Sequence, residues 1–316
     1  MYREAPCAVC SPTGPKTLRP GKAAPSSVSP GVGSEATKRP VTVERGGFTL
    51  AGAAVGAETG VPLVLLHGLT ATRRYVVMGS QALERAGHVV VAYDARGHGA
   101  SGSPGERSAY QYTDLTGDLS AVLDEIGSAR AVLVGGSMGA ATAMALALGQ
   151  PERVAALVQI TPAYAGSPDE RPEVAAGWKR LADGLERGGV EGFVAASEWP
   201  PAFADSAREA ARQRLARHRD LAAVADALRV VPGSAAFDGL ERLREVEQPV
   251  LVVGSRDEGD PMHPLAVAER YAELLPDAEL IVEDAGRPPL AWQGVQVSRA
   301  ITGFLRRAGL APGDQP

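Results

Sequence analysis

Residues 131–149 read AVLVGGSMGAATAMALALG, and this stretch decides the fold. It begins with an apolar run typical of a buried strand, passes through the pentapeptide G-x-S-x-G, and continues as Ala-rich helical text. Small residues on both sides of Ser137 permit a tight strand-to-helix turn that lifts the serine Oγ clear of the sheet. The order of strand, turn and helix therefore predicts Ser137 as a nucleophile at such a turn.

Apolar runs alternate with helical stretches on either side of this turn, over residues 41–160 and 236–310. The runs that fit strands buried on both faces are VPLVLLHG (61–68), HVVVAYD (88–94), VAALVQI (154–160) and PVLVVG (249–254). Strands separated by helices predict a mostly parallel sheet with helices on both faces.

Two segments break this alternation. Residues 161–235 hold helical, charged, Ala-rich text without a convincing strand, which predicts an inserted helical cap or lid over the sheet. Residues 1–40 are rich in Pro, Gly, Ser and Ala and hold few clustered apolar side chains, so a disordered tail is expected there.

Composition excludes several classes of partner. The net charge of −5 and the isoelectric point near 5.7 offer no basic excess for nucleic acid or an anionic membrane surface. No apolar run reaches the roughly 18 uncharged residues that a membrane span needs, and a cytoplasmic location is expected. Cys7 and Cys10 are the only cysteines, and their single CxxC predicts no metal site.

Two further loops follow predicted strands. The run His67-Gly68-Leu69-Thr70 lies where an oxyanion hole is expected, with the amides of Leu69 and Met138 as its donors. His67 is either a structural residue or a substrate-binding residue. The stretch YDARGHGAS (93–101) predicts a loop shaped by glycines, which an Asp94–Arg96 pair would brace.

HGLT, YDARGHGAS, GGSMG and a late Asp-containing loop, in that order, resemble the α/β-hydrolase superfamily over about residues 41–310. The resemblance is to the esterase, lactonase and acyltransferase-like branch with a helical cap. It implies an α/β-hydrolase fold and a catalytic serine, acid and histidine in that chain order.

The resemblance implies that the acid lies in the loop after PVLVVG, where two aspartates compete. Asp257 has the usual short distance from the strand end. Asp260 begins a D-P-x-x-P pattern at the usual distance from the following helix, which favours Asp260. Either carboxylate would hold an imidazole in the required tautomer.

The histidine that the resemblance implies is missing, because Arg287 stands at its place and no histidine follows His263. A guanidinium has no acceptor and cannot take the serine proton. His263, His67 or His98 would then substitute, or Ser137 would act without a strong base. Arg287 is also a candidate partner for an aspartate or for a substrate carboxylate.

Trp292, next to the Arg287 loop, is a candidate for the wall of an apolar substrate pocket. Together these features predict a cofactor-free enzyme that acts on a small ester, thioester or lactone. The alternatives are a catalytically silent ligand-binding relative, or a lyase or cyclase that uses the same pocket. The oligomeric state stays open.

Overall fold

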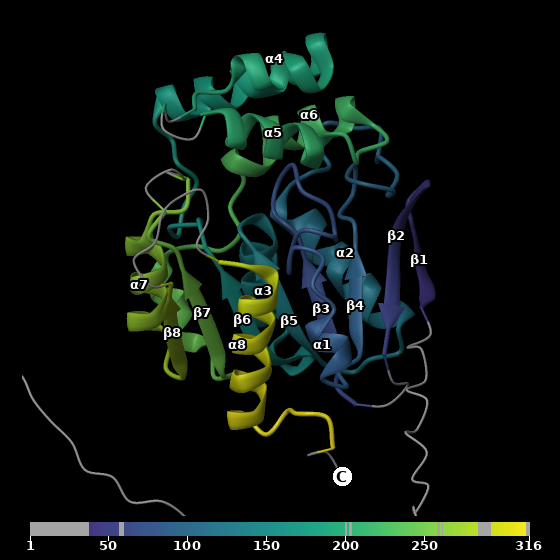
Figure 1. Ribbon diagram of the computed structural model, residues 1–316, viewed down its shortest axis with the longest axis vertical. Coiled ribbons are helices and arrows are strands. Elements are labelled where there is room, and N and C mark those ends of the chain that lie inside the picture. Colours follow the sequence, from purple (N-terminus) through teal and green to yellow (C-terminus); the bar gives the residue numbers. More distant parts are fainter. Residues whose placement is uncertain are drawn as a thin grey trace, which may run out of the picture. The chain divides into compact units, whose positions relative to one another are not determined.

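An eight-stranded sheet forms the centre of the protein in the computed structural model (Figure 1), which describes residues 38–56, 60–199, 201, 204–257, 260, 262–283 and 292–313. All of these residues belong to the unit Ala36–Pro316. The strands are β1 (Arg39–Arg45), β2 (Phe48–Val55), β3 (Leu63–Leu66), β4 (Val90–Tyr93), β5 (Ala131–Gly136), β6 (Val154–Ile160), β7 (Val250–Gly254) and β8 (Ala278–Val282).

The strand order is β1-β2-β4-β3-β5-β6-β7-β8, and all pairs are parallel except β1–β2 and β2–β4. The carboxyl ends of β3 to β8 therefore lie along one edge of the sheet, and the loops that follow them come together there.

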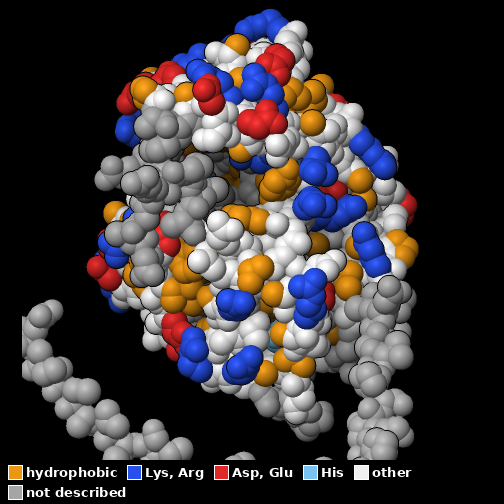
Figure 2. Space-filling view, viewed as in Figure 1, with side chains coloured by type: hydrophobic (Ala, Val, Ile, Leu, Met, Phe, Trp, Pro, Cys, Tyr) orange, Lys and Arg blue, Asp and Glu red, His pale blue; other side chains and the backbone are white. Residues whose placement is uncertain are grey.

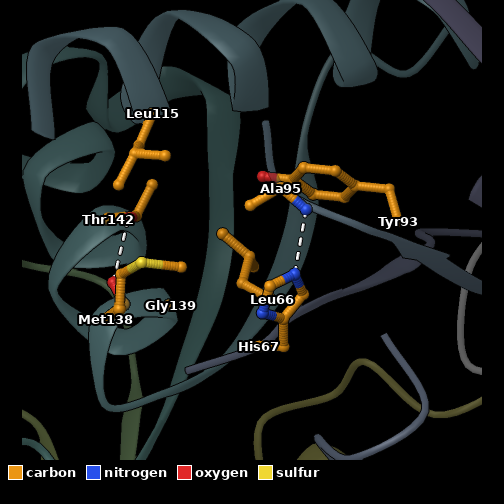
Figure 3. Close-up of a pocket in the computed structure, with 8 residues that line it drawn as sticks. All are labelled: Leu66, His67, Tyr93, Ala95, Leu115, Met138, Gly139 and Thr142. Carbon is orange, nitrogen blue, oxygen red and sulfur yellow. Dashed lines mark hydrogen bonds between the residues drawn. The ribbon is translucent and has the colours of Figure 1, made fainter. Parts of the chain in front are cut away.

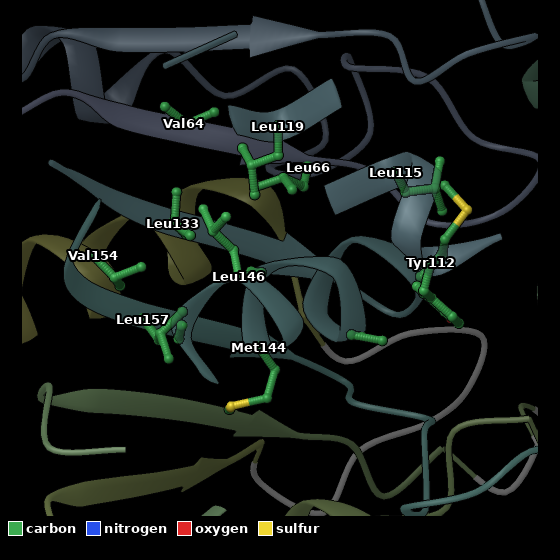
Figure 4. Packing of buried hydrophobic residues seen from close by; sticks show 14 of the residues in the cluster. Val64, Leu66, Tyr112, Leu115, Leu119, Leu133, Met144, Leu146, Val154 and Leu157 are labelled. Carbon is green, nitrogen blue, oxygen red and sulfur yellow. The ribbon is translucent and has the colours of Figure 1, made fainter. Parts of the chain in front are cut away.

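Eight α-helices are described, and those outside the segment between β6 and β7 cover both faces of the sheet. They are α1 (Ala82–Arg85), α2 (Tyr112–Glu125), α3 (Met138–Gly149), α4 (Pro172–Ala196), α5 (Ala204–Leu215), α6 (Leu221–Val230), α7 (Leu265–Leu274) and α8 (Gly294–Arg307). One apolar cluster packs α2, α3 and α7 against the sheet (Figure 4), and a second packs α1 and α8 against the opposite face. The predicted mostly parallel sheet with helices on both faces is confirmed.

Strand β5 shows why a continuous apolar run suits this position. Leu133 belongs to the cluster under α3, whereas Val132 and Val134 belong to the cluster under α8, and none of the three is exposed. A strand in the middle of a parallel sheet needs apolar side chains on both of its faces, so alternation with polar residues is absent.

Between β6 and β7 the described residues form α4, α5, α6 and short 3-10 turns. These three helices share an apolar cluster of their own, which includes Leu185, Phe193, Leu215 and Leu228. Figure 1 shows them together at the end of the sheet where the parallel strands finish. In Figure 2 the surface is hollowed between these helices and the part of the molecule that carries the strands.

Candidate active site

Ser137 lies in the sharp turn between β5 and α3. Its backbone has φ 51° and ψ −112°, and it is one of four non-glycine residues with positive φ among those described. The turn is held by two hydrogen bonds: Ser137 N donates to Ile160 O over 3.1 Å, and Ala141 N donates to Ser137 O over 3.0 Å. A strained backbone of this kind persists only where its surroundings fix it, and it often marks a functional residue.

The outer two glycines of the pentapeptide are required by space. A Cβ at Gly135 would lie 2.3 Å from Gly139 O, and a Cβ at Gly139 would lie 2.2 Å from Leu66 O. At Gly136, by contrast, a Cβ would meet nothing within 4 Å. The two outer glycines of the motif therefore permit two close backbone contacts, one within the turn and one between the turn and β3.

The loop after β3 lies directly against Ser137. A Cβ at Gly68 would be 3.3 Å from Ser137 Cβ, so this loop passes beside the serine side chain. Met138 begins α3, where the first backbone N–H groups have no partner inside the helix. The structure thus brings the Leu69 and Met138 region, expected as an oxyanion hole, to the same corner as Ser137.

His67 is held as a structural residue. Its Nδ1 donates to Gly68 O over 2.8 Å, and its Nε2 accepts from Ala95 N over 2.9 Å (Figure 3). Burial lowers the pKa of His67 to about 4, against the opposing effect of its bond to Gly68. Both ring nitrogens are occupied, so His67 has no lone pair for the serine proton.

The cavity in Figure 3, lined by His67, Met138 and Thr142 among others, has a volume of about 10 Å³. That volume holds at most about one water molecule, so this is not a substrate site. A larger cavity of about 350 Å³ borders Pro62 and Val89, at the starts of β3 and β4. It therefore lies at the edge of the sheet opposite Ser137.

The buried His67 and His98 form a cluster with the half-buried His218, with ring centroids 5.2 Å apart for His67 and His98 and 5.5 Å apart for His98 and His218. His98 Nδ1 donates to Arg96 O, which leaves its buried Nε2 without a partner. His218 accepts from Gly99 N and donates to Thr70 O, both over 2.9 Å. Burial lowers the pKa of each of these histidines.

Sequence reasoning missed His218. It follows α5 in the helical segment, and it joins that segment to the loops after β3 and β4. These contacts span more than a hundred residues of chain, and no local spacing predicts them.

The predicted Asp94–Arg96 pair is wrong. Asp94 accepts from Arg73 Nη1 over 2.6 Å, whereas Arg96 donates to both carboxylate oxygens of Asp118 over 2.7 Å each. Asp94 and Arg96 are close in sequence, but each takes its partner from another element. Their loop is still braced, by two ion pairs in place of one.

The loop after β7 brings Asp260 and His263 together. Its start is tied to the end of β8, because Arg256 N donates to the buried Glu283 over 2.8 Å. His263 Nδ1 lies 2.7 Å from Asp260 Oδ2, while Asp257 N donates to Ser255 Oγ over 3.2 Å. Of the two competing aspartates, the structure pairs Asp260 with a histidine.

The pKa of the Asp260 carboxyl is held below its usual range. Burial alone would raise that pKa, but the hydrogen bond and charge of His263, the amide of Met262 and the charge of Arg214 together lower it. Asp260 therefore stays ionised at neutral pH and holds a proton on His263 Nδ1. The other nitrogen, Nε2, is then an acceptor.

All five histidines of the chain lie in its described part, and none of them is hydrogen-bonded to Ser137 Oγ there. Arg287 lies outside the described residues. Trp292 donates from Nε1 to Gly254 O over 2.8 Å and packs against the cluster under α8, so its ring is partly core.

In the parts of the chain that the structure describes, no group of His, Cys, Asp and Glu side chains could hold a metal ion. Nor does any helix there combine the length and apolarity needed to cross a bilayer.

Comparison with known proteins gives consistent matches. A model of the alpha/beta hydrolase fold family matches residues 61–188. A protein from Variovorax paradoxus that carries the name carbamate hydrolase RutD is 30% identical over 271 residues, which cover 82% of this chain and 96% of the relative. Another, from Bacillus subtilis, carries the name 2-succinyl-6-hydroxy-2,4-cyclohexadiene-1-carboxylate synthase and is 28% identical over 259 residues, which cover 79% and 92%.

A solved structure of a thermophilic esterase from Thermogutta terrifontis superposes with a TM-score of 0.66 at 24% identity, covering 86% of this chain and 99% of the esterase. With the strand order, the strained serine turn and a relative matched over nearly its whole length, the chain belongs to the α/β-hydrolase family.

Proposed function

We propose that this protein is a serine hydrolase that acts on a small ester, thioester or lactone, with Ser137 as its nucleophile. The observation that carries the proposal is the strained turn at Ser137, where two glycines are required by backbone contacts on either side of the serine. A family fold alone does not imply an activity, whereas a serine held in this geometry has the position of a nucleophile.

Ser137 Oγ attacks the carbonyl carbon of the substrate, and the amides of Leu69 and Met138 stabilise the negative oxygen that forms. The alcohol, thiol or ring oxygen then leaves with a proton, and an acyl-serine remains. Water hydrolyses that acyl-serine to the acid and restores Ser137.

His263 is the proposed base, oriented by Asp260. A carboxylate on Nδ1 and a free Nε2 make the arrangement that a general base needs. Closure of the loop after β7 would bring Nε2 to Ser137 Oγ, since catalytic hydrogen bonds are often long before substrate binds. Helices α4, α5 and α6 serve in this proposal as a lid over the site.

A second candidate is a lyase or cyclase reaction in the same pocket. It is favoured by the lack of a histidine bonded to Ser137 Oγ in the described residues and by the name of the Bacillus subtilis relative, a synthase. In that case Ser137 would orient a substrate or move its proton without becoming acylated.

Labelling with a fluorophosphonate separates the two candidates. The wild type, Ser137→Ala and His263→Ala proteins are treated with the probe and read by intact mass, alongside turnover of p-nitrophenyl acetate and butyrate. Ser128→Ala is the matched control, because Ser128 is a half-buried serine away from the turn, whose hydroxyl donates to Arg130 O.

The hydrolase proposal expects labelling and turnover in the wild type and in Ser128→Ala, and neither in Ser137→Ala. A wild type that neither takes up the probe nor releases p-nitrophenol would rule out the hydrolase and favour the second candidate.

A further inference from the structure

Arg214 is a cation of α5 that lies near the loops after β3 and β7. The end of α5 lies on the loop after β3, because Tyr75 OH donates to Gln213 O over 3.3 Å and His218 bonds Thr70 O. Arg214 lies in electrostatic reach of Tyr75 on that loop and of Asp260 on the loop after β7.

The strand order then fixes what lies beneath Arg214. Between β3 and β7 the sheet contains β5 and β6, and the carboxyl end of β5 carries Ser137. A guanidinium in electrostatic reach of both outer loops is therefore on the side of the sheet where the two inner strands end. Figure 1 shows α5 on this side of the sheet.

Among the described residues, Arg214 has no hydrogen-bond or ion-pair partner. Its Nε is fully buried and makes no hydrogen bond, and no carboxylate of the described residues forms an ion pair with it. Other arginines of the helical segment are paired: Arg212 bonds Glu191 over 2.7 Å, and Arg229 bonds Asp183 over 2.9 Å. The nearby carboxylate, Asp260, hydrogen-bonds His263 instead.

A buried and unpaired guanidinium is costly. Burial lowers the pKa of Arg214, an effect that the charges of Asp260 and Tyr75 oppose, but a guanidinium keeps its proton at any ordinary pH. Leaving such a donor unpaired costs free energy that an incoming anion would recover. Its planar fork of N–H donors matches the two oxygens of a carboxylate.

We infer that Arg214 binds a carboxylate of the substrate, so that the preferred substrate is a small ester, thioester or lactone with a free carboxylate on its acyl part. The inference rests on the proposed function and adds the substrate class. In this arrangement Ser137 meets the acyl carbonyl while Arg214 holds the far end of the acyl chain.

The test compares two esters that differ in one charge, the p-nitrophenyl half-ester of glutaric acid and p-nitrophenyl valerate, each measured as kcat/KM. The variants are Arg214→Gln, which removes the charge, and Arg214→Lys, which keeps it. The matched control is Arg208→Gln, because Arg208 is a more exposed arginine of α5 that pairs with Asp205.

For Arg214→Gln we expect kcat/KM for the half-ester to fall by about 10- to 100-fold, which is the effect of losing a charged hydrogen-bond pair. The neutral ester should change by less than about 3-fold, since a neutral acyl chain makes no charged contact with the guanidinium. Arg214→Lys should recover part of the loss, and Arg208→Gln should alter neither ester.

Equal losses on both esters would overturn the inference, because Arg214 would then act only by positioning Asp260. No loss on the half-ester would overturn it as well. Turnover of the neutral ester in either case would leave the proposed function intact.

If the wild type turns over neither ester, binding of glutarate to the Ser137→Ala protein is measured by calorimetry. A Kd that weakens at least 10-fold on adding Arg214→Gln would support the carboxylate site while the hydrolase proposal fails. Absence of glutarate binding would overturn the carboxylate site too.

Discussion

His263 Nδ1 lies 2.7 Å from Asp260 Oδ2, and both residues belong to one loop, three positions apart. In the arrangement that the family resemblance implies, acid and histidine come from different loops. Here the loop after β7 supplies both. The carboxylate therefore orients the imidazole ring from within the same loop.

Asp260→Asn tests that orientation. An amide no longer holds the proton on Nδ1 or offsets an imidazolium charge, so we expect kcat for a p-nitrophenyl ester to fall by about 10²- to 10⁴-fold. Asp257→Asn is the comparison, and there we expect a change of less than about 3-fold, because the carboxylate that holds His263 Nδ1 is that of Asp260. A larger loss in Asp257→Asn than in Asp260→Asn would show that the acid has been assigned to the wrong residue.

The glycines of the serine turn make a matched set. Gly135→Ala and Gly139→Ala each force a Cβ against a backbone oxygen, at 2.3 and 2.2 Å, and we expect the free energy of unfolding in urea to fall by about 3 kcal/mol. Gly136→Ala has open space around its Cβ and should stay within about 1 kcal/mol of the wild type. Similar losses for all three variants would mean that close packing does not explain the motif.

The serine turn and the sheet were predictable because their signals are local: an apolar run, a glycine-flanked serine and a helix follow one another within residues 131–149. The site's charged partners were not. Arg96 pairs with Asp118 on α2, and the Asp94 carboxylate is taken by Arg73. Such pairs depend on how loops and helices meet in space, and proximity in sequence misled the interpretation.

The Arg96–Asp118 pair gives a prediction of its own. Asp118 is 1% exposed, so removing its partner leaves a buried carboxylate with Arg45 as its remaining ion-pair partner among the described residues. We expect Arg96→Met to lower the free energy of unfolding by about 3 to 5 kcal/mol. Arg270→Met breaks two ion pairs between exposed side chains, with Glu241 and Glu273, and should cost less than about 1 kcal/mol; equal costs would contradict the burial argument.

The lowered pKa values in the histidine cluster predict that the free energy of unfolding falls in acid. An unfolded histidine takes up a proton near its ordinary pKa of 6.5, whereas folded His67 does so only near 4. The unfolded state therefore binds more protons as the pH falls between these values, and the protein loses stability. His67 alone accounts for about 3 kcal/mol at pH 4.

This is measured by urea unfolding at several values between pH 7 and pH 4. His67→Gln should lose less stability than the wild type over that range. A wild type and a His67→Gln protein with parallel pH dependence would show that His67 does not contribute.

Replacing the strained Ser137 by glycine should raise the free energy of unfolding although it removes the activity. A serine at φ 51° and ψ −112° occupies backbone space that glycine reaches at lower cost, and such strain is worth about 1 to 3 kcal/mol. Glycine also gains freedom in the unfolded chain, which offsets part of the relief, so Ser137→Gly should raise the free energy of unfolding by about 1 kcal/mol. Ser137→Ala keeps the strain and should not be stabilised in this way.

Both variants should lose turnover of p-nitrophenyl esters, because neither has a hydroxyl to acylate. If Ser137→Gly were less stable than Ser137→Ala, the turn would not be strained, and the main structural support for a nucleophile at this position would be lost.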